Sequence, residues 1–262
     1  SRCLTFLFRF PLAEKHFSSI PYNNRNIYSH SEINKHLLEC SDEKCESRVF
    51  GSYETNNWNT FEMNEEEKRW NDFEAVLEAL DKYIKSGKIR YIGISNETPY
   101  GLSKYLEISK NKKLPRMMSV QNPYSLVNRT YEIGMSEISI REKCGLLVYY
   151  PLAAGALSGK YRNGEMPENS RMALFKGWER MINPLAMKAY DEYYKLAKEY
   201  NMTMVQLAQA FVNSRPFVTS NIIGATTIDQ LKENIGSISV KLNQEILDKI
   251  NLIHNNNPNP SP

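Results

Sequence analysis

The sequence predicts a parallel α/β fold that resembles half of an eightfold (β/α)8 barrel. Three observations indicate it: strand and helix signals alternate from residue 64 onward, most connections between them are short, and each of four predicted strands is followed by at least one helix. Residues 13–48 are polar and carry only scattered apolar side chains. We therefore expect a divergent, poorly ordered segment over residues 1–49, with an irregular stretch from Cys3 to Leu12, and the barrel part over residues 50–262.

The first predicted unit is a helix followed by a strand. Asn64 is a suitable N-cap because three glutamates follow it in the first turn, where free N–H groups favour negative charge. Apolar residues then recur at spacings of three and four as far as Ile84, and Gly87 ends the helix. Ile89–Ser95 is short, β-branched and aromatic, as expected of a buried strand.

The same alternation continues to the end of the chain. Three more strands are predicted, at Met117–Gln121, Gly145–Tyr150 and Asn221–Ala225. A helix is predicted over Tyr131–Lys143, and further helices start at the N-caps Thr98, Asn183, Thr203, Thr227 and Asn243. The long irregular stretch from Ser158 to Met181 is of a length that is commonly functional.

Composition limits the partners that we expect. The 262 residues are 24% charged and 41% hydrophobic with a net charge of +3, which excludes a highly charged disordered tail or a nucleic-acid arm. No stretch approaches the ~20 apolar residues of a membrane span. Four cysteines without a regular framework suggest reduced thiols and a cytoplasmic location. We expect a small-molecule ligand, no nucleic-acid or membrane partner and no metal; the oligomeric state stays open.

Polar and aromatic residues end the predicted strands, where ligands bind in such barrels. They are Ser95-Asn96, Gln121-Asn122, Tyr149-Tyr150 and Gly224 to Thr227. Hydroxyl and amide groups offer paired donors and acceptors for a carboxamide, and an aromatic ring can stack on a flat heterocycle. Read alone, these residues are only suggestive of a site, and ordinary loop residues are the favoured interpretation.

A phosphate site is predicted at the start of the helix after the last strand. Gly224 permits close backbone approach, and Thr226, Thr227 and the free N–H groups of the helix suit an anion. Lys160 and Arg171 in the long stretch are candidates to converge on that phosphate. The alternatives are a plain capped helix and a solvated basic face.

Four segments together resemble the aldo-keto reductases, and most closely the bacterial branch related to the potassium-channel β subunits. In one-letter code they are KIRYIGISNE from Lys88, VQNPYSLVN from Val120, YPLAAGALSGKY from Tyr150 and IIGATTIDQLKENI from Ile222. The resemblance covers residues 50–262 in order and at family spacing. It implies a (β/α)8 barrel of which this chain shows strands five to eight, the cofactor-binding half.

The resemblance also implies roles for individual residues toward NADPH or NADP. Ser95, Asn96 and Gln121 match residues that hold the nicotinamide carboxamide, and Tyr149 matches the aromatic that stacks on the nicotinamide ring. Three further sets match the nucleotide phosphates: Tyr150, Leu152, Ala154 and Gly155 at the pyrophosphate, Lys160 and Arg171 near the adenosine phosphates, and Gly224, Thr226, Gln230, Glu233 and Asn234 in the adenosine-phosphate clamp. Tyr150 departs from the more usual Ser.

The family's catalytic Asp, Tyr, Lys and His are not found at matching motifs, so no catalytic residue is assigned. Residues 50–61 resemble the substrate loop, in which Trp58 is a candidate contact or a packing residue. The spacing of His30, His36, Cys40 and Cys45 lacks the paired short spacings of zinc modules, and an ordinary polar segment is the favoured interpretation.

Three functional interpretations follow. The favoured one is an NADPH-dependent oxidoreductase that reduces aldehydes or ketones to alcohols, in a chain whose N-terminal strands are missing or divergent. The second is a regulatory or vestigial protein that binds NADP(H) without turnover. The third is a truncated product that does not fold alone, because half a barrel leaves strand edges unpaired.

Overall fold

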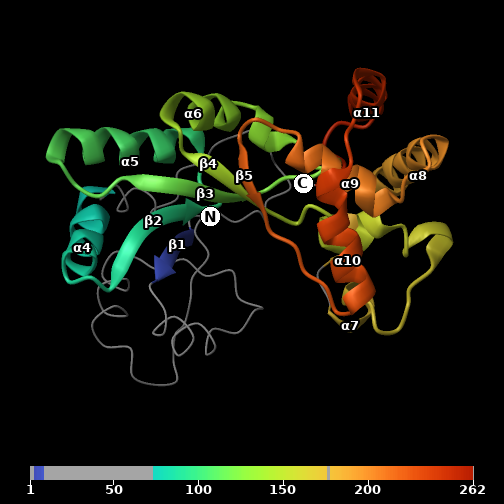
Figure 1. Cartoon of the computed structure of the whole chain (residues 1–262), viewed down its shortest axis with the longest axis horizontal. Coiled ribbons are helices and arrows are strands. Elements are labelled where there is room, and N and C mark those ends of the chain that lie inside the picture. The colour runs from blue at the N-terminus through green and yellow to red at the C-terminus, as the bar shows by residue number, and fades with distance from the viewer. Residues whose placement is uncertain (1–2, 9–72, 176–177, 262) are drawn as a thin grey trace. The chain divides into compact units, whose positions relative to one another are not determined.

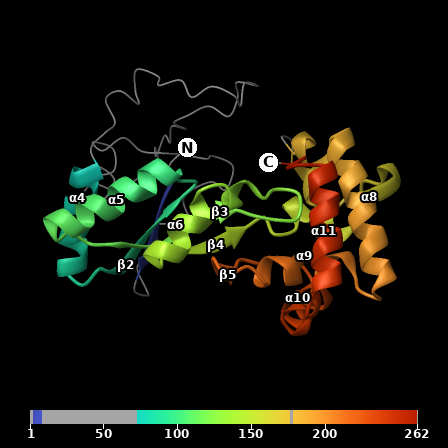
Figure 2. The same cartoon turned by 90° about the horizontal axis from the view of Figure 1, so that it is seen from above.

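The computed structural model describes residues 3–8, 73–175 and 178–261. They form two compact units, one up to Gln121 and one from Asn122 onward. Figures 1 and 2 show the elements of each unit, and each unit is described by itself below.

The first unit holds a parallel pair of strands with helices packed on it. Its elements are β1 (Cys3–Phe8), α4 (Phe73–Lys85), β2 (Ile89–Ser95), α5 (Pro99–Lys112) and β3 (Met117–Pro123), whose last two residues belong to the second unit. β2 and β3 run parallel, with Ser95 opposite Gln121. β1 pairs with β2 in the antiparallel sense. The irregular segment expected from Cys3 is therefore wrong for residues 3–8, and β1 departs from an all-parallel sheet.

The apolar face predicted for the first helix is confirmed over the described part of that helix. Phe73, Val76, Leu77 and Leu80 are buried in α4, and the Phe73 ring meets the Tyr105 ring of α5 edge-on at a centroid distance of 4.9 Å. Burial of such side chains contributes roughly 1.5–3 kcal/mol each relative to exposure. The predicted start at Asn64 lies outside the described residues.

The second unit is built around the parallel pair β4 (Gly145–Tyr149) and β5 (Val218–Asn221). Its longer helices are α6 (Met135–Glu142), α8 (Pro184–Glu199), α9 (Met204–Asn213), α10 (Ile228–Gly236) and α11 (Gln244–Asn256). Short helical turns connect them: η1 (Thr130–Glu132), η2 (Ala153–Ser158), η3 (Arg162–Gly164), α7 (Arg171–Leu174), η4 (Glu179–Ile182) and η5 (Ser237–Ser239).

The five predicted N-caps that lie within the described residues are confirmed. Each capping side chain accepts a hydrogen bond from the backbone N–H three residues further on, which satisfies one of the free donors of the first turn. The caps are Thr98, Asn183, Thr203, Thr227 and Asn243. Thr203 and Gln206 also form the reciprocal bonds of a capping box.

Two element predictions are wrong in their boundaries. The last strand runs over Val218–Asn221 and not over Asn221–Ala225, because the register with β4 places Val218 opposite Leu146 and ends at Asn221. The isoleucine pair on which the prediction rested follows this ladder and is exposed. The helix predicted over Tyr131–Lys143 is interrupted at Gly134, whose φ of +82° lies outside the helical region.

A half-buried ion pair organises the segment after β3. Arg129 donates two hydrogen bonds to Glu132, from Nε to Oε1 and from Nη2 to Oε2, both at 2.8 Å. The Tyr124 hydroxyl donates to the same carboxylate, and Arg129 Nη1 donates to Asn251 of α11 at 2.9 Å. Within the second unit the arrangement joins the segment after β3 to the C-terminal helix. Burial alone would raise the pKa of Glu132, but the bonds from Arg129 and Tyr124 outweigh it and hold the pKa below its ordinary value of 4.5.

Replacing this carboxylate tests its contribution to stability. We expect Glu132→Gln to lower the free energy of unfolding by about 2 kcal/mol at pH 7, since the Arg129 guanidinium loses its charged acceptor. Because the folded-state pKa is depressed, the contribution is complete above pH 4.5 and is lost as the pH falls below it. Urea unfolding between pH 3.5 and 7 measures both effects. The exposed pair Glu137–Arg141 provides the control, and Glu137→Gln should change stability by less than about 0.5 kcal/mol.

Candidate functional site

Three of the predicted residues lie together at the ends of β2 and β3, and we call them the strand-end cluster: Ser95, Asn96 and Gln121. Ser95 and Gln121 are register partners, and the Asn96 N–H donates to the Gln121 carbonyl at 2.9 Å. Asn96 has a φ of +54°, a left-handed conformation that asparagine tolerates. Ser95 is buried, and the two amides are half-buried. Their donors and acceptors match those of a primary carboxamide.

Glu97 follows this cluster directly in the sequence and contacts the start of α5. Its buried carboxylate accepts hydrogen bonds from the Thr98 N–H at 2.9 Å and from the Thr98 hydroxyl at 3.3 Å, at the N-terminus of α5. The carboxylate lies so close to Gly101 that a Cβ there would overlap it. Neither residue was predicted to have a role. The sequence signal for the contact was Gly101 itself, because a glycine in the first turn of a helix costs about 1 kcal/mol relative to alanine and so indicates that a side chain is excluded there.

Aromatic rings end β4 in the second unit. The Tyr149 and Tyr150 rings meet edge-on at 4.6 Å, and the Tyr150 ring meets that of Trp178 at 5.4 Å. The Arg171 guanidinium lies 5.6 Å from the centre of the Trp178 ring, within the range of a cation–π contact. This places the long stretch after η2 against the end of β4.

The segment after Tyr150 follows a tightly turned path. Tyr150, Ala153, Ala154 and Gly155 all have positive φ values, which non-glycine residues rarely adopt. The Ala153 N–H donates to the Tyr150 carbonyl and the Gly155 N–H to the Leu152 carbonyl, both at 2.8 Å. Turned backbone of this kind forms concavities that suit anions, although two of its N–H groups are bonded within the turn.

Lys160 lies directly over this turn. A Cβ on Gly155 would come within 3.1 Å of Lys160 Cε and 3.2 Å of Nζ, so the absence of a side chain at Gly155 makes room for the lysine. The ammonium is 5.2 Å from the centre of the Tyr161 ring. Among the described residues no carboxylate lies within ion-pair distance of it. By contrast, Arg162 forms an ion pair with Asp191, with 2.7 Å between Nε and Oδ1, and its guanidinium lies over the Tyr194 ring.

The residues of the predicted phosphate clamp bond mostly to one another and to α9. Gln230 Oε1 accepts from the Thr226 N–H at 2.9 Å and from its hydroxyl at 3.0 Å. Glu233 accepts from the Thr203 hydroxyl at 2.6 Å. Gln230 therefore holds the loop before α10, and Glu233 ties that helix to the start of α9.

Asn234 belongs to a buried polar network that the sequence analysis did not find. Its amide donates to the Gly224 carbonyl at 3.4 Å and accepts from Gln209 at 3.3 Å, and Gln209 in turn accepts from Asn221 at 2.5 Å. The network joins α9, β5 and α10. Gln209 is 1% exposed and lies between apolar residues in α9. A glutamine at such a position was the sequence signal for this network.

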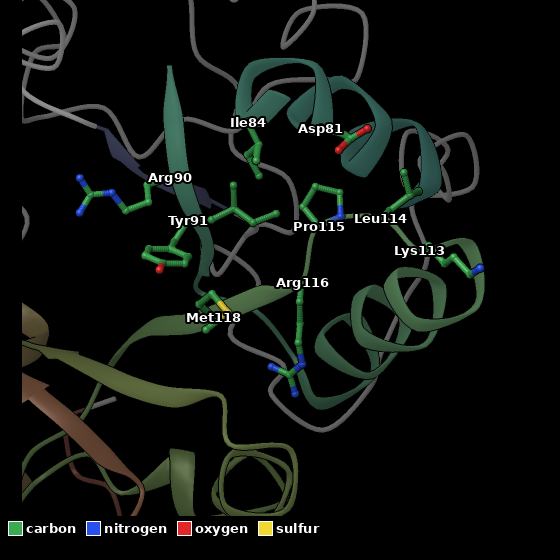
Figure 3. Close-up of a pocket in the computed structure, with 10 residues that line it drawn as sticks. Asp81, Ile84, Arg90, Tyr91, Lys113, Leu114, Pro115, Arg116 and Met118 are labelled. Carbon is green, nitrogen blue, oxygen red and sulfur yellow. The ribbon is translucent and has the colours of Figure 1, made fainter. Parts of the chain in front are cut away.

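A separate pocket of about 320 Å³ lies at the other end of β2 from Ser95. Figure 3 shows its walls, which come from α4, from the start of β2 and from the segment that leads into β3. None of the predicted cofactor residues lines it.

A family model described as the aldo/keto reductase family matches residues 44–255. The chain belongs to the aldo/keto reductase family. Protein tas of Escherichia coli is 43% identical over 187 residues, which are 71% of this chain and 54% of that relative. An aldo-keto reductase of Babesia bovis is 38% identical over 62% of this chain and 59% of its own length. L-glyceraldehyde 3-phosphate reductase of Escherichia coli is 30% identical, over 63% and 49% respectively.

The family confirms the predicted barrel fold, and the parallel pairs β2–β3 and β4–β5 with their helices agree with it. The chain spans about half the length of the curated aldo/keto reductases and other relatives that it matches. Trp58, His30, His36, Cys40 and Cys45 lie outside the described residues, and their predicted roles are not tested.

Within residues 3–8, 73–175 and 178–261, no group of three or more His, Cys, Asp or Glu side chains is placed to hold a metal ion. In the same residues no helix has both the length and the apolar character needed to cross a membrane.

The close approach of the Glu97 carboxylate to Gly101 can be tested by adding a side chain at position 101. Glycine to alanine inside a helix normally raises stability by about 1 kcal/mol. We expect Gly101→Ala to lower the melting temperature instead, because its methyl group displaces the Glu97 carboxylate. Thermal unfolding of the variant and of the unchanged chain measures the shift in melting temperature.

The matched control is Gly236→Ala at the end of α10, where a Cβ meets no atom within 4 Å. It should leave the melting temperature unchanged or raise it. Equal effects of the two substitutions would contradict the role given to Glu97.

Proposed function

We propose that this chain supplies the NADP(H)-binding half of an oxidoreductase that reduces aldehydes or ketones to alcohols. The observation that carries the proposal is the strand-end cluster. In a chain of the aldo/keto reductase family, Ser95, Asn96 and Gln121 are backbone neighbours at the ends of two parallel strands, and they carry a hydroxyl and two amides. This is the edge at which barrels of this kind bind ligands.

Each chemical group of the cofactor is assigned to described residues whose chemistry suits it. Ser95, Asn96 and Gln121 have the donors and acceptors to hold the nicotinamide carboxamide, and Tyr149 has the flat ring to lie against the nicotinamide. NADPH, when bound, supplies the hydride that the substrate carbonyl accepts. The pyrophosphate role proposed for Tyr150, Leu152, Ala154 and Gly155 is supported by the turned backbone that these residues share.

Positive charge is available for the adenosine phosphates. Lys160 has no carboxylate partner among the described residues, so its ammonium does not have to leave an ion pair to meet a phosphate. The Arg171 guanidinium lies 5.6 Å from the centre of the Trp178 ring. Gly224, Thr226, Gln230, Glu233 and Asn234 are proposed as the clamp on that end, with Thr226 exchanging its bond to Gln230 for one to phosphate. This basic and hydroxyl-rich end supports NADP(H) over NAD(H).

The reaction adds a hydride to the carbonyl carbon and a proton to the carbonyl oxygen, and it yields an alcohol and NADP. The role of the described residues is to bind and orient the hydride donor. We propose Trp58 as a substrate contact and assign the proton donor to no described residue. We propose a cytoplasmic location, in which thiols stay reduced, because the four cysteines of the sequence form no regular framework.

Removing the Lys160 ammonium tests cofactor binding. We expect Lys160→Ala to raise the Kd for NADPH about tenfold or more, the loss of one charge-assisted contact of 1.5–3 kcal/mol. The fluorescence of NADPH during titration measures it. Lys195→Ala is the control, since Lys195 is an exposed lysine on α8 with the same charge. Absence of saturable binding by the folded chain would contradict the proposal.

Turnover is measured separately, as steady oxidation of NADPH with a reactive aromatic aldehyde. Oxidation would exclude the alternative of a protein that binds NADP(H) only as a regulator. Binding without oxidation would favour that alternative for this chain.

A further inference from the structure

Three aromatic rings contact one another in sequence at the end of β4, and we call Tyr149, Tyr150 and Trp178 the aromatic row. The Tyr149 and Tyr150 rings have centroids 4.6 Å apart and planes that differ by 78°. The Tyr150 and Trp178 rings have centroids 5.4 Å apart and planes that differ by 85°. Both contacts have the edge-on geometry that aromatic pairs favour. The Tyr150 ring therefore connects the other two rings.

The backbone at Trp178 is held in place. Trp178 is the N-cap residue of η4, and its carbonyl accepts a hydrogen bond from the Met181 N–H at 2.9 Å. The Met181 side chain is buried, and its carbonyl accepts from the buried Tyr190 hydroxyl of α8 at 2.8 Å. η4 also packs against η2. The Trp178 ring thus extends from a segment that is anchored to α8 and η2.

The backbone of Tyr150 is also constrained. Its φ of +57° lies in the left-handed region, which bulky residues rarely adopt. Its carbonyl accepts from the Ala153 N–H at 2.8 Å, in the turn that follows β4. A strained residue persists where its surroundings determine its conformation, and such residues cluster at ligand sites. The turn therefore fixes the direction in which the Tyr150 side chain leaves the backbone, next to the Tyr149 ring.

We propose that Tyr150 and Trp178 are positioning residues that fix the orientation of the Tyr149 ring. The inference rests on the proposed function, in which Tyr149 lies against the nicotinamide. An aromatic side chain has several staggered rotamers, and selecting one of them when a ligand binds costs entropy. The contact with Tyr150, which Trp178 supports in turn, selects that rotamer before NADP(H) binds. The Tyr150 and Trp178 rings thus increase the affinity for the nicotinamide by acting through Tyr149.

The test compares two ligands that differ in the nicotinamide alone. NADPH and 2′-phospho-ADP-ribose share the adenosine, the phosphates and the second ribose, and NADPH also carries the nicotinamide. Titration calorimetry of the full 262-residue chain gives both Kd values. We define the affinity ratio as the Kd of 2′-phospho-ADP-ribose divided by the Kd of NADPH. A purely structural change, or a change at the phosphates, alters both Kd values alike and leaves this ratio constant.

Removal of the Tyr150 ring should lower the affinity ratio. We expect Tyr150→Ala to lower it about fivefold, the scale of one lost aromatic pair. Tyr150→Phe keeps the ring and should restore the ratio of the unchanged chain. Tyr200→Ala is the matched control, because Tyr200 lies at the end of α8, where it bonds to Glu245 and Lys249. It should leave the ratio unchanged.

The role of Trp178 is tested in the same way. We expect Trp178→Leu to lower the affinity ratio about threefold. Added to Tyr150→Ala it should lower the ratio no further, because Trp178 acts through Tyr150. The Arg171 guanidinium lies over the Trp178 ring, and a change in its contact with the phosphates would cancel in the ratio.

Three results would overturn the inference. They are an affinity ratio that Tyr150→Ala leaves unchanged, a loss in Tyr150→Phe as large as in Tyr150→Ala, and effects of Tyr150→Ala and Trp178→Leu that multiply in the double variant. If Tyr150→Ala does not unfold cooperatively, Trp178→Leu decides alone, and an unchanged ratio in that folded variant contradicts the inference. A folded chain that binds neither ligand refutes the proposed function as well, whereas NADPH binding with an unchanged ratio refutes the positioning role alone.

Discussion

The hydrogen bonds of the buried Asn234 side chain set the orientation of α10, and much of the second unit depends on that orientation. Through Gln209 and Asn221 they connect α9, β5 and α10, and through the Gly224 carbonyl they position the loop before α10. Together with the bond from Thr203 to Glu233, these bonds hold α10 with Asn234 buried and with Ile228 and Ile235 exposed. Gly224 and Asn234, two of the predicted phosphate residues, belong to the same network.

Local signals were sufficient for most of the helices and strands. Thr98, Asn183 and Thr227 start helices where the sequence places them, because a cap is a bond between residues three apart. β5 was misplaced because its limits depend on pairing with β4. The isoleucine pair has a strand composition but lies after the last register pair, Val148 with Asn221, although the Ile222 N–H still donates to the Val148 carbonyl. The break at Gly134 was missed because the apolar residues on either side continue a helical pattern.

In the candidate site, too, local sequence predicted some features, whereas others depend on tertiary contacts. Residue types at strand ends predicted Ser95, Asn96 and Gln121, since parallel strands bring their carboxyl ends to one edge. Gln230 and Asn234 were predicted as ligand residues, but the structure also gives them partners in Thr226, Gly224 and Gln209. Such pairings depend on how a loop and two helices meet in space, which no spacing in the sequence encodes.

Close contact between Glu97 and Gly101 has an evolutionary consequence. The backbone of Gly101 is not in the left-handed region, so the neighbouring carboxylate is what keeps a side chain out. If Glu97 were replaced by a shorter residue during divergence, position 101 would become free to gain a side chain and with it helix propensity. Positions 97 and 101 should therefore change together across homologous chains. Such covariation would mark the members that keep the contact between Glu97 and Gly101 next to Ser95 and Asn96.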